Sequence, residues 1–237
     1  MNLFIHTSKS SDDLANAFAK QLVEWIKESP EKSFHVALSG GKTPSLLFSI
    51  LAEKYNDAAI WKDVHFWWGD ERMVPPEDSE SNFGVVNNLF FLKIGITSDH
   101  IHRIKGESEA EKESANYGIE IKRDIPDSNG WPTFDLIILG LGDDGHTASI
   151  FPGKLKLLNS ELITEIALHP QTGQQRITLT GKVLNNAKKV AFLVSGSSKS
   201  RIFNEIIHDS PAASRYPASF IRPEKELHWF IDEACIG

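Results

Sequence analysis

The sequence predicts an α/β protein with a mostly parallel sheet and helices on both faces. Short apolar segments alternate along the chain with longer segments whose apolar residues recur at helical spacing, and this alternation is typical of parallel sheets. Several expected strands are mostly apolar, as strands buried on both faces are. The 237 residues suffice for one large domain, and no change of composition marks a boundary, so we expect a single domain over residues 1–237.

The first part of the chain should supply three strands, namely Asn2–His6, Phe34–Leu38 and Val64–Trp68. Between the first two, Ser10 or Ser11 followed by Asp12 and Asp13 predicts a helix start, because these side chains cap a helix N-terminus and complement its dipole. Helices are also expected over 45–54 and 82–92. Pro44 suits the first turn of the former, where its missing N–H is no loss.

The second part of the chain continues the alternation. A charged helix over 108–125 and a turn-rich connector over 126–132 lead into the most apolar strand, Phe134–Leu139. Residues 155–165 carry no clear pattern and stay unassigned. The remaining expected strands are Arg176–Thr180, Lys189–Ser195 and His228–Asp232, with a helix ending at Ile207 before the last of them.

Composition and charge narrow the possible functions. A formal net charge of −7 argues against nucleic-acid binding, which needs a basic face, but leaves room for an anionic small molecule. No apolar run reaches the ~20 residues of a membrane helix, and the N-terminus lacks a signal-peptide pattern, so we expect a cytoplasmic protein. Cys235, the single cysteine, cannot form an internal disulfide and is expected to be unreactive.

Three of the expected strands end in glycine-rich polar turns. These turns are residues 39–44, 140–146 and 196–201. Parallel strands present their carboxyl ends at one edge of the sheet, and open α/β sheets bind their ligands there. We therefore expect the three turns to meet at a single site.

The first turn is a candidate anion site. Gly40 and Gly41 let backbone N–H groups and the positive end of the next helix face an anion, and Lys42 and Thr43 add a charge and a hydroxyl. A purely structural turn is the alternative. A nucleotide P-loop is disfavoured, because that pattern needs a glycine where this chain has Val36.

The central turn contains Gly140, Gly142 and Gly145 in the spacing of a dinucleotide fingerprint. That fingerprint must open a helix and be followed by a strand that ends in an acid. Pro152 interrupts the helix, and no such strand follows. A nicotinamide site is therefore disfavoured.

The same turn carries Asp143, Asp144 and His146. A histidine can take a proton from water and return it to a leaving oxygen, and a neighbouring carboxylate can orient its ring. The alternatives are a histidine that only caps a helix and a metal site. A metal is disfavoured, because a second histidine or a cysteine at suitable spacing is missing.

Further charged residues follow two other strands. The segment Asp70–Arg72 allows two interpretations. Arg72 can bind an anion through both arms of its guanidinium, with the two acids modulating its charge, or the three residues form a surface salt-bridge cluster. Lys199 and Arg201 lie in a Gly-Ser-Ser turn from which either can reach a phosphate. An anion clamp beside a histidine base predicts a hydrolase or isomerase of a small phosphorylated molecule.

Several segments resemble the glucosamine-6-phosphate isomerase/6-phosphogluconolactonase family, and in particular its 6-phosphogluconolactonase members. The similar segments are Leu38–Pro44, Trp68–Pro75 with Ser81 and Asn82, Leu139–Gly153, Val194–Lys199, and the tail Pro217–Ile221 through Trp229–Asp232. The resemblance implies a Rossmann-like fold and hydrolysis of 6-phospho-D-glucono-1,5-lactone, the second step of the oxidative pentose phosphate pathway, without a metal or organic cofactor.

The resemblance also implies roles for individual residues. His146 would be the general base, with Asp144 beside it, while Arg72 and Lys199 would grip the phosphate with help from the Gly40–Thr43 turn. Lys42 and Asp143 depart from the residues usual in the family, so which aspartate supports His146 stays open. The expected partner is the small-molecule substrate, with no nucleic acid or membrane, and the expected state is a monomer or small homo-oligomer.

Two other functions remain to be distinguished. The aminosugar-phosphate deaminases of the same group follow the histidine turn with an acid-containing segment, whereas this chain has Ala148–Pro152 without an acid. A non-catalytic sugar-phosphate binding protein would need Arg72 and Lys199 but not His146.

Overall fold

The computed structural model describes residues 1–236, and its centre is a six-stranded parallel sheet in the order β1-β11-β10-β7-β2-β3. All five neighbouring pairs run parallel. The strands are β1 (Asn2–Ser8), β2 (Phe34–Leu38), β3 (Val64–Trp68), β7 (Leu136–Leu139), β10 (Lys189–Val194) and β11 (Glu226–Asp232). The mostly parallel α/β architecture predicted from the sequence is confirmed.

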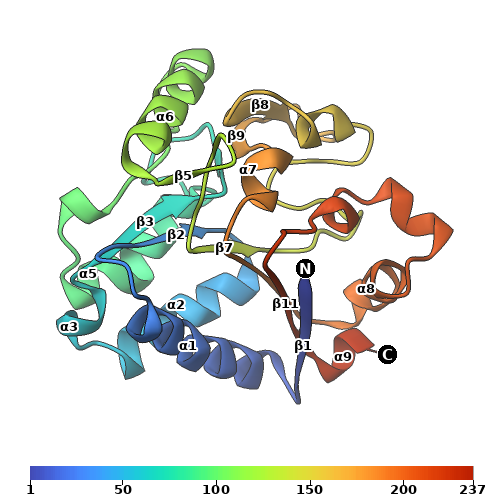
Figure 1. The fold of residues 1–237 in the computed structure, drawn as a ribbon, viewed down its shortest axis with the longest axis horizontal. Coiled ribbons are helices and arrows are strands. Elements are labelled where there is room, and N and C mark those ends of the chain that lie inside the picture. Colours follow the sequence, from blue (N-terminus) through green and yellow to red (C-terminus); the bar gives the residue numbers. More distant parts are fainter. Residues whose placement is uncertain (237) are drawn as a thin grey trace.

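Helices cover both faces of this sheet (Figure 1). The long helices α1 (Ser11–Glu28) and α2 (Lys42–Lys54) pack against each other on one side, and α6 (Ala110–Asp124) and α7 (Gly181–Asn185) lie on the other. The remaining α-helices are α3 (Ala58–Trp61), α4 (Asn82–Val86), α5 (Leu92–Ile94), α8 (Ser200–Ile207) and α9 (Glu233–Ile236). Short helical turns are η1 (Asn87–Phe91), η2 (Ser98–His100), η3 (Leu155–Leu158), η4 (Ser197–Lys199), η5 (Pro211–Arg215) and η6 (Pro217–Phe220).

A second, antiparallel sheet was only partly expected. It consists of β4 (Asp70–Arg72), β9 (Gln175–Leu179) and β8 (Thr164–Leu168) in the order β4-β9-β8. β4 has three polar residues and becomes a strand only through its pairing with β9, so local pattern does not reveal it. A small hairpin joins β5 (Asp127–Ser128) to β6 (Trp131–Pro132) within the expected connector.

The helix boundaries follow local chemistry. Ser10 caps α1 by accepting the backbone N–H of Asp13, as predicted. The helix expected from Ser45 begins earlier, at Lys42, and includes Pro44 in its first turn. The helix expected over 82–92 is present but contains the π-helical turn η1.

The core lies between the sheet and its covering layers. Its largest fully buried side chains include Trp61, Trp67, Trp68 and Trp229. Cys235 is also buried, and burial raises the pKa of its thiol to about 12, which agrees with the expected lack of reactivity. Among residues 1–236, no helix combines the length and the apolar character needed to cross a bilayer.

Candidate active site

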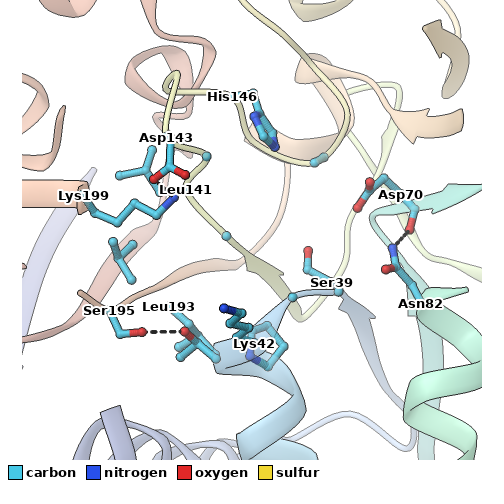
Figure 2. Close-up of a pocket in the computed structure, with 18 of the residues that line it drawn as sticks. Ser39, Lys42, Asp70, Asn82, Leu141, Asp143, His146, Leu193, Ser195 and Lys199 are labelled. Carbon is cyan, nitrogen blue, oxygen red and sulfur yellow. Dashed lines mark hydrogen bonds and ion pairs between the residues drawn. The ribbon is translucent and has the colours of Figure 1, made fainter. Parts of the chain in front are cut away.

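A cavity of about 480 Å³ lies at the carboxyl ends of β2, β7 and β10. Residues from all three glycine-rich turns line it (Figure 2), so the predicted convergence of the turns is confirmed. The predicted site residues in its wall are Gly40, Gly41, Lys42, Thr43, Asp70, Arg72, Asp143, His146 and Lys199. Arg201 is not part of the wall; its exposed side chain lies 3.8 Å from Glu205 on α8.

The imidazole of His146 is held by Asp144. Oδ1 of Asp144 lies 2.6 Å from Nδ1 of His146 and also accepts the backbone N–H of the same residue at 3.0 Å. Because a carboxylate accepts only, Nδ1 carries the proton and Nε2 is the free lone pair of the neutral ring. Partial burial raises the pKa of Asp144, but the hydrogen bonds from His146 outweigh this and lower it to about 2. The carboxylate therefore stays charged across the neutral range.

The turn that carries His146 is closed by its own backbone. The N–H of Gly142 donates to the carbonyl of His146 at 2.9 Å, and the hydroxyl of Thr147 donates to the carbonyl of Gly140 at 2.9 Å. A Cβ atom on Gly142 would lie 2.1 Å from Nδ1 of His146. Only glycine at position 142 thus lets the ring pack on this backbone.

The neighbouring aspartate serves a different residue. Oδ1 of Asp143 lies 2.6 Å from Nζ of Lys199 and also accepts the hydroxyl of Ser198 at 3.0 Å. The hydrogen bond from Lys199 lowers the pKa of Asp143. The sequence left open which aspartate supports His146. In the structure Asp144 contacts His146, and Asp143 contacts Lys199.

The first glycine-rich turn presents the N-terminus of α2 to the cavity. No side chain caps this helix, and its first turn contains no acid, so its free N–H groups and dipole remain available to an anion. A Cβ atom on Gly40 would lie 1.8 Å from Oδ1 of Asn82, so glycine is needed for the close approach of that amide. Thr43 contacts Ser195, the residue directly before the third turn, with their hydroxyl oxygens 2.8 Å apart, and this contact joins the first turn to the start of the third.

Two arginines on neighbouring strands supply the largest positive charge. Arg72 on β4 is paired in register with Arg176 on β9, and both line the cavity. In the part of the chain described, no carboxylate oxygen lies within 4 Å of either guanidinium. Burial and the charge of Arg72 lower the pKa of Arg176. Two adjacent cations without an acid make a site for an anion.

The acids beside Arg72 have structural partners. Asp70 is buried and accepts the hydroxyl of Ser149 at 2.7 Å, which ties β4 to the histidine loop. Glu71 is also buried and accepts the backbone N–H groups of Asn82 and Phe83 at 2.8 and 2.7 Å. Burial outweighs these bonds and raises the pKa of Glu71 to about 7. The alternative of a surface salt-bridge cluster is therefore wrong, because both acids are buried and neither pairs with the guanidinium of Arg72.

Reasoning from the sequence missed Arg176 as a site residue and gave Asn82 no role. Asn82 donates from Nδ2 to the backbone carbonyl of Asp70 at 2.8 Å and lines the cavity (Figure 2). The only indication in the sequence that Asn82 belongs to the site was its place in a segment that resembles the family. Arg176 lay at the start of an expected strand, and its position as the one charged residue of that strand was the available signal.

A histidine–aspartate pair facing an excess of cations, at the carboxyl edge of a parallel sheet, is typical of α/β enzymes that act on small anionic molecules. Residues 9–229 match the family model described as glucosamine-6-phosphate isomerases/6-phosphogluconolactonase. The chain belongs to this family, and the resemblance seen in its sequence is confirmed.

Individual relatives agree with this assignment. A protein of Haemophilus influenzae named 6-phosphogluconolactonase is 46% identical over 205 residues, which span 85% of this chain and 86% of the relative. A 6-phosphogluconolactonase of Treponema pallidum is 38% identical over 194 residues, which span 82% and 80% of the two chains.

Solved structures show the same fold. The 6-phosphogluconolactonase from Trypanosoma cruzi superposes with a TM-score of 0.89 at 27% identity and covers 99% of this chain and 97% of its own. A monomeric glucosamine-6-phosphate deaminase superposes with a TM-score of 0.81 at 18% identity, covering 98% of each chain. At that identity the likeness to the deaminase concerns the fold alone.

Proposed function

We propose that this chain hydrolyses 6-phospho-D-glucono-1,5-lactone to 6-phospho-D-gluconate, the second step of the oxidative pentose phosphate pathway. The relatives that share most of its length carry the name of this activity. The single observation that carries the proposal is the His146–Asp144 pair at 2.6 Å beside a cation-rich cavity. A small anionic ester needs a proton acceptor for water next to a group of positive charges.

His146 is the proposed general base. Its Nε2 takes a proton from a water molecule, and the oxygen of that water attacks the lactone carbonyl carbon. The tetrahedral intermediate then collapses with cleavage of the bond from this carbon to the ring oxygen, and the imidazolium returns its proton to the ring oxygen. Asp144 stabilises the charged ring between the two steps and keeps its orientation. The carboxylic acid formed in this way ionises to 6-phosphogluconate and releases one proton to the solvent. No electrons are transferred, so the cycle requires no redox cofactor.

The phosphate is the proposed ligand of the positive groups in the wall. Arg72 and Lys199 bind its oxygens, and the Gly40–Thr43 turn adds backbone N–H groups at the start of α2. Arg176 is added to this set because it lies opposite Arg72 in the β4–β9 pair and has no acidic partner. Asp143 keeps Lys199 in place until the phosphate arrives.

Other parts of the proposal come from the sequence and the family. They are a cytoplasmic location, a monomer or small homo-oligomer, and a small molecule as the sole partner. The deaminase alternative lacks a supporting observation, since the loop after His146 that lies against Asp70 contains Ser149 and Ala148 but no acid.

Lactone turnover tests this function. The lactone is generated in situ, excess 6-phosphogluconate dehydrogenase reports the product, and the rate is compared with spontaneous hydrolysis. We expect a large enzyme-dependent rate with this substrate and none with glucosamine 6-phosphate. Deamination of glucosamine 6-phosphate, or product binding without lactone turnover, would overturn the proposal in favour of the deaminase or the binding protein.

A further inference from the structure

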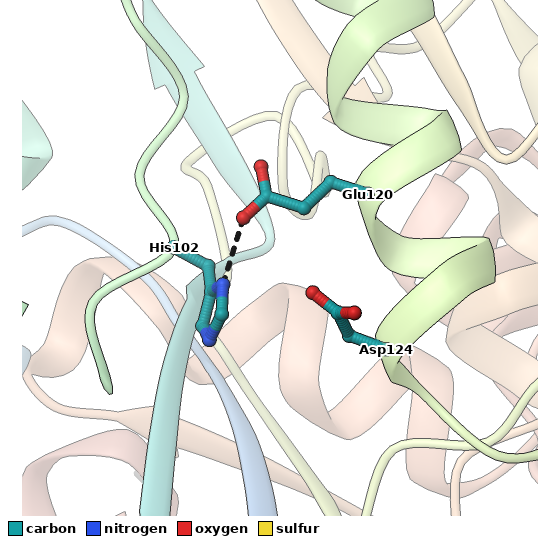
Figure 3. A group of neighbouring side chains, drawn as sticks. All are labelled: His102, Glu120 and Asp124. Carbon is teal, nitrogen blue, oxygen red and sulfur yellow. Dashed lines mark hydrogen bonds and ion pairs between the residues drawn. The ribbon is translucent and has the colours of Figure 1, made fainter. Parts of the chain in front are cut away.

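A second group of ionisable side chains lies outside the cavity. It consists of His102, in the segment after η2, and of Glu120 and Asp124, one turn apart on α6 (Figure 3). One ligand atom from each of the three lies within 4.8 Å of the others. Within residues 1–236, no other three histidine, cysteine or acidic side chains meet this condition.

The ring of His102 is held in place before any ligand arrives. It stacks on the indole of Trp67, with centroids 3.9 Å apart and planes 5° apart. Its Nε2 lies 3.0 Å from Nδ1 of His65, and its Nδ1 lies 2.8 Å from Oε1 of Glu120. A ring fixed by stacking and by a partner on its second nitrogen has the arrangement of a metal-ligating histidine.

The two acids face that ring from one side of α6. Residues four apart lie on the same helix face, and both carboxylates point toward His102 in Figure 3. Two like charges at this spacing repel each other. Arg123 pairs with Asp124, but its side chain is 67% exposed, and exposed ion pairs contribute little.

We propose that His102, Glu120 and Asp124 bind one divalent transition-metal ion, with Zn²⁺ as the best match. One imidazole nitrogen with two carboxylate oxygens suits a borderline ion better than Mg²⁺ or Ca²⁺, which take oxygen ligands. Zinc bonds of about 2.0–2.2 Å put tetrahedral ligands about 3.4 Å apart, so shifts of roughly 1 Å in these side chains suffice.

Protons and solvent can be accommodated at this site. Coordination through Nδ1 puts the proton of His102 on Nε2, where Nδ1 of His65 accepts it across the existing 3.0 Å contact. The side chains of His102, Glu120 and Asp124 are 11%, 34% and 26% exposed. The ion therefore has a path of entry, and water can complete its coordination.

The ion would have a structural role. The backbone N–H of His102 donates to the carbonyl of Phe66 on β3, the edge strand of the sheet, so the metal would tie α6 to that edge. None of its three ligands lines the active-site cavity. The proposal is thus independent of the proposed lactonase activity.

Calorimetric titration of chelator-treated full-length protein with ZnCl₂ tests the proposal. We expect binding of one ion at this site, weakened at least tenfold in Glu120→Gln and in Asp124→Asn. Glu111→Gln, on the same helix but away from the cluster, and His146→Ala, in the cavity, are matched controls that should retain it. Free Zn²⁺ at 100 times its Kd should raise Tm by about 5–10 °C in wild type and much less in the two cluster variants.

Two results would overturn the metal site. One is the absence of Zn²⁺ binding by folded wild-type protein. The other is binding that Glu120→Gln and Asp124→Asn leave unchanged, or that only His146→Ala removes. Circular dichroism verifies that each variant is folded, and lactone turnover, which none of the cluster residues should affect, verifies it further for Glu120→Gln, Asp124→Asn and Glu111→Gln.

Discussion

Replacing Arg176 by methionine should weaken substrate binding without lowering the free energy of unfolding. Arg72 on β4 and Arg176 on β9 lie opposite each other without an acidic partner. Their repulsion lowers the stability of the ligand-free protein, and we assign Arg176 to binding of the anion. Methionine keeps an unbranched apolar side chain but removes the guanidinium, whose central carbon now lies 5.7 Å from the centroid of the Phe151 ring.

The structure sets the expected magnitudes. A hydrogen bond to a charged group contributes about 1.5–3 kcal/mol, which corresponds to a rise of about 10- to 150-fold in KM and in the Kd of 6-phosphogluconate. A like-charged pair directly across two strands costs about 0.2–1 kcal/mol. The free energy of unfolding of Arg176→Met should therefore be unchanged or raised by up to this amount.

Steady-state kinetics, product titration and urea unfolding measure these quantities. Arg201→Met is the matched control, because Arg201 lies on α8 outside the cavity and pairs with Glu205; its KM should equal that of wild type. An unchanged KM in Arg176→Met would refute the anion-binding role. A loss of more than about 2 kcal/mol of stability, within the range typical of core defects, would show that Arg176 is instead a structural residue.

Three further predictions follow from the same geometry. Asp144→Asn should lower kcat by at least tenfold with little change in KM, because the amide can support the wrong tautomer of the His146 ring; an unchanged kcat would separate Asp144 from the reaction. Gly142→Ala should impair kcat while the protein still folds, since the added methyl group would lie 2.1 Å from Nδ1 of His146, and a crystal structure of the variant should show the ring displaced. The raised pKa of Glu71, about 7 against 4.5 for an ordinary glutamate, makes its contribution to stability complete below pH 4.5 and lost as the pH rises through 7. Glu71→Gln should flatten that decline in urea unfolding across pH 4.5–8, and an identical slope in the variant would contradict the assignment.

The location of the site was predictable because it depends on topology. Parallel strands end at one edge of a sheet, so the turns after Leu38, Leu139 and Val194 had to approach one another. His146 and Lys199, which belong to two of these turns, line the same cavity for this reason. The choice between Asp143 and Asp144 was not predictable, because it depends on the path of a tight turn in which the backbone of Gly142 packs on the imidazole.

Arg176 was missed for a different physical reason. Its partner strand β4 has three polar residues that carry no strand pattern, and β9 follows about a hundred residues later. Only the long-range register between the two strands brings Arg176 beside Arg72. Local patterns identify a strand but do not specify the strand with which it pairs.

The most direct test of the central claim compares wild type with His146→Ala in lactone hydrolysis, with and without EDTA, against the spontaneous rate. General base catalysis typically contributes about 10²- to 10⁴-fold, so kcat should fall within that range while the affinity for 6-phosphogluconate is retained. EDTA should leave the wild-type rate unchanged. A fall of less than tenfold in His146→Ala, or loss of the wild-type rate in EDTA, would contradict a metal-free reaction driven by this histidine.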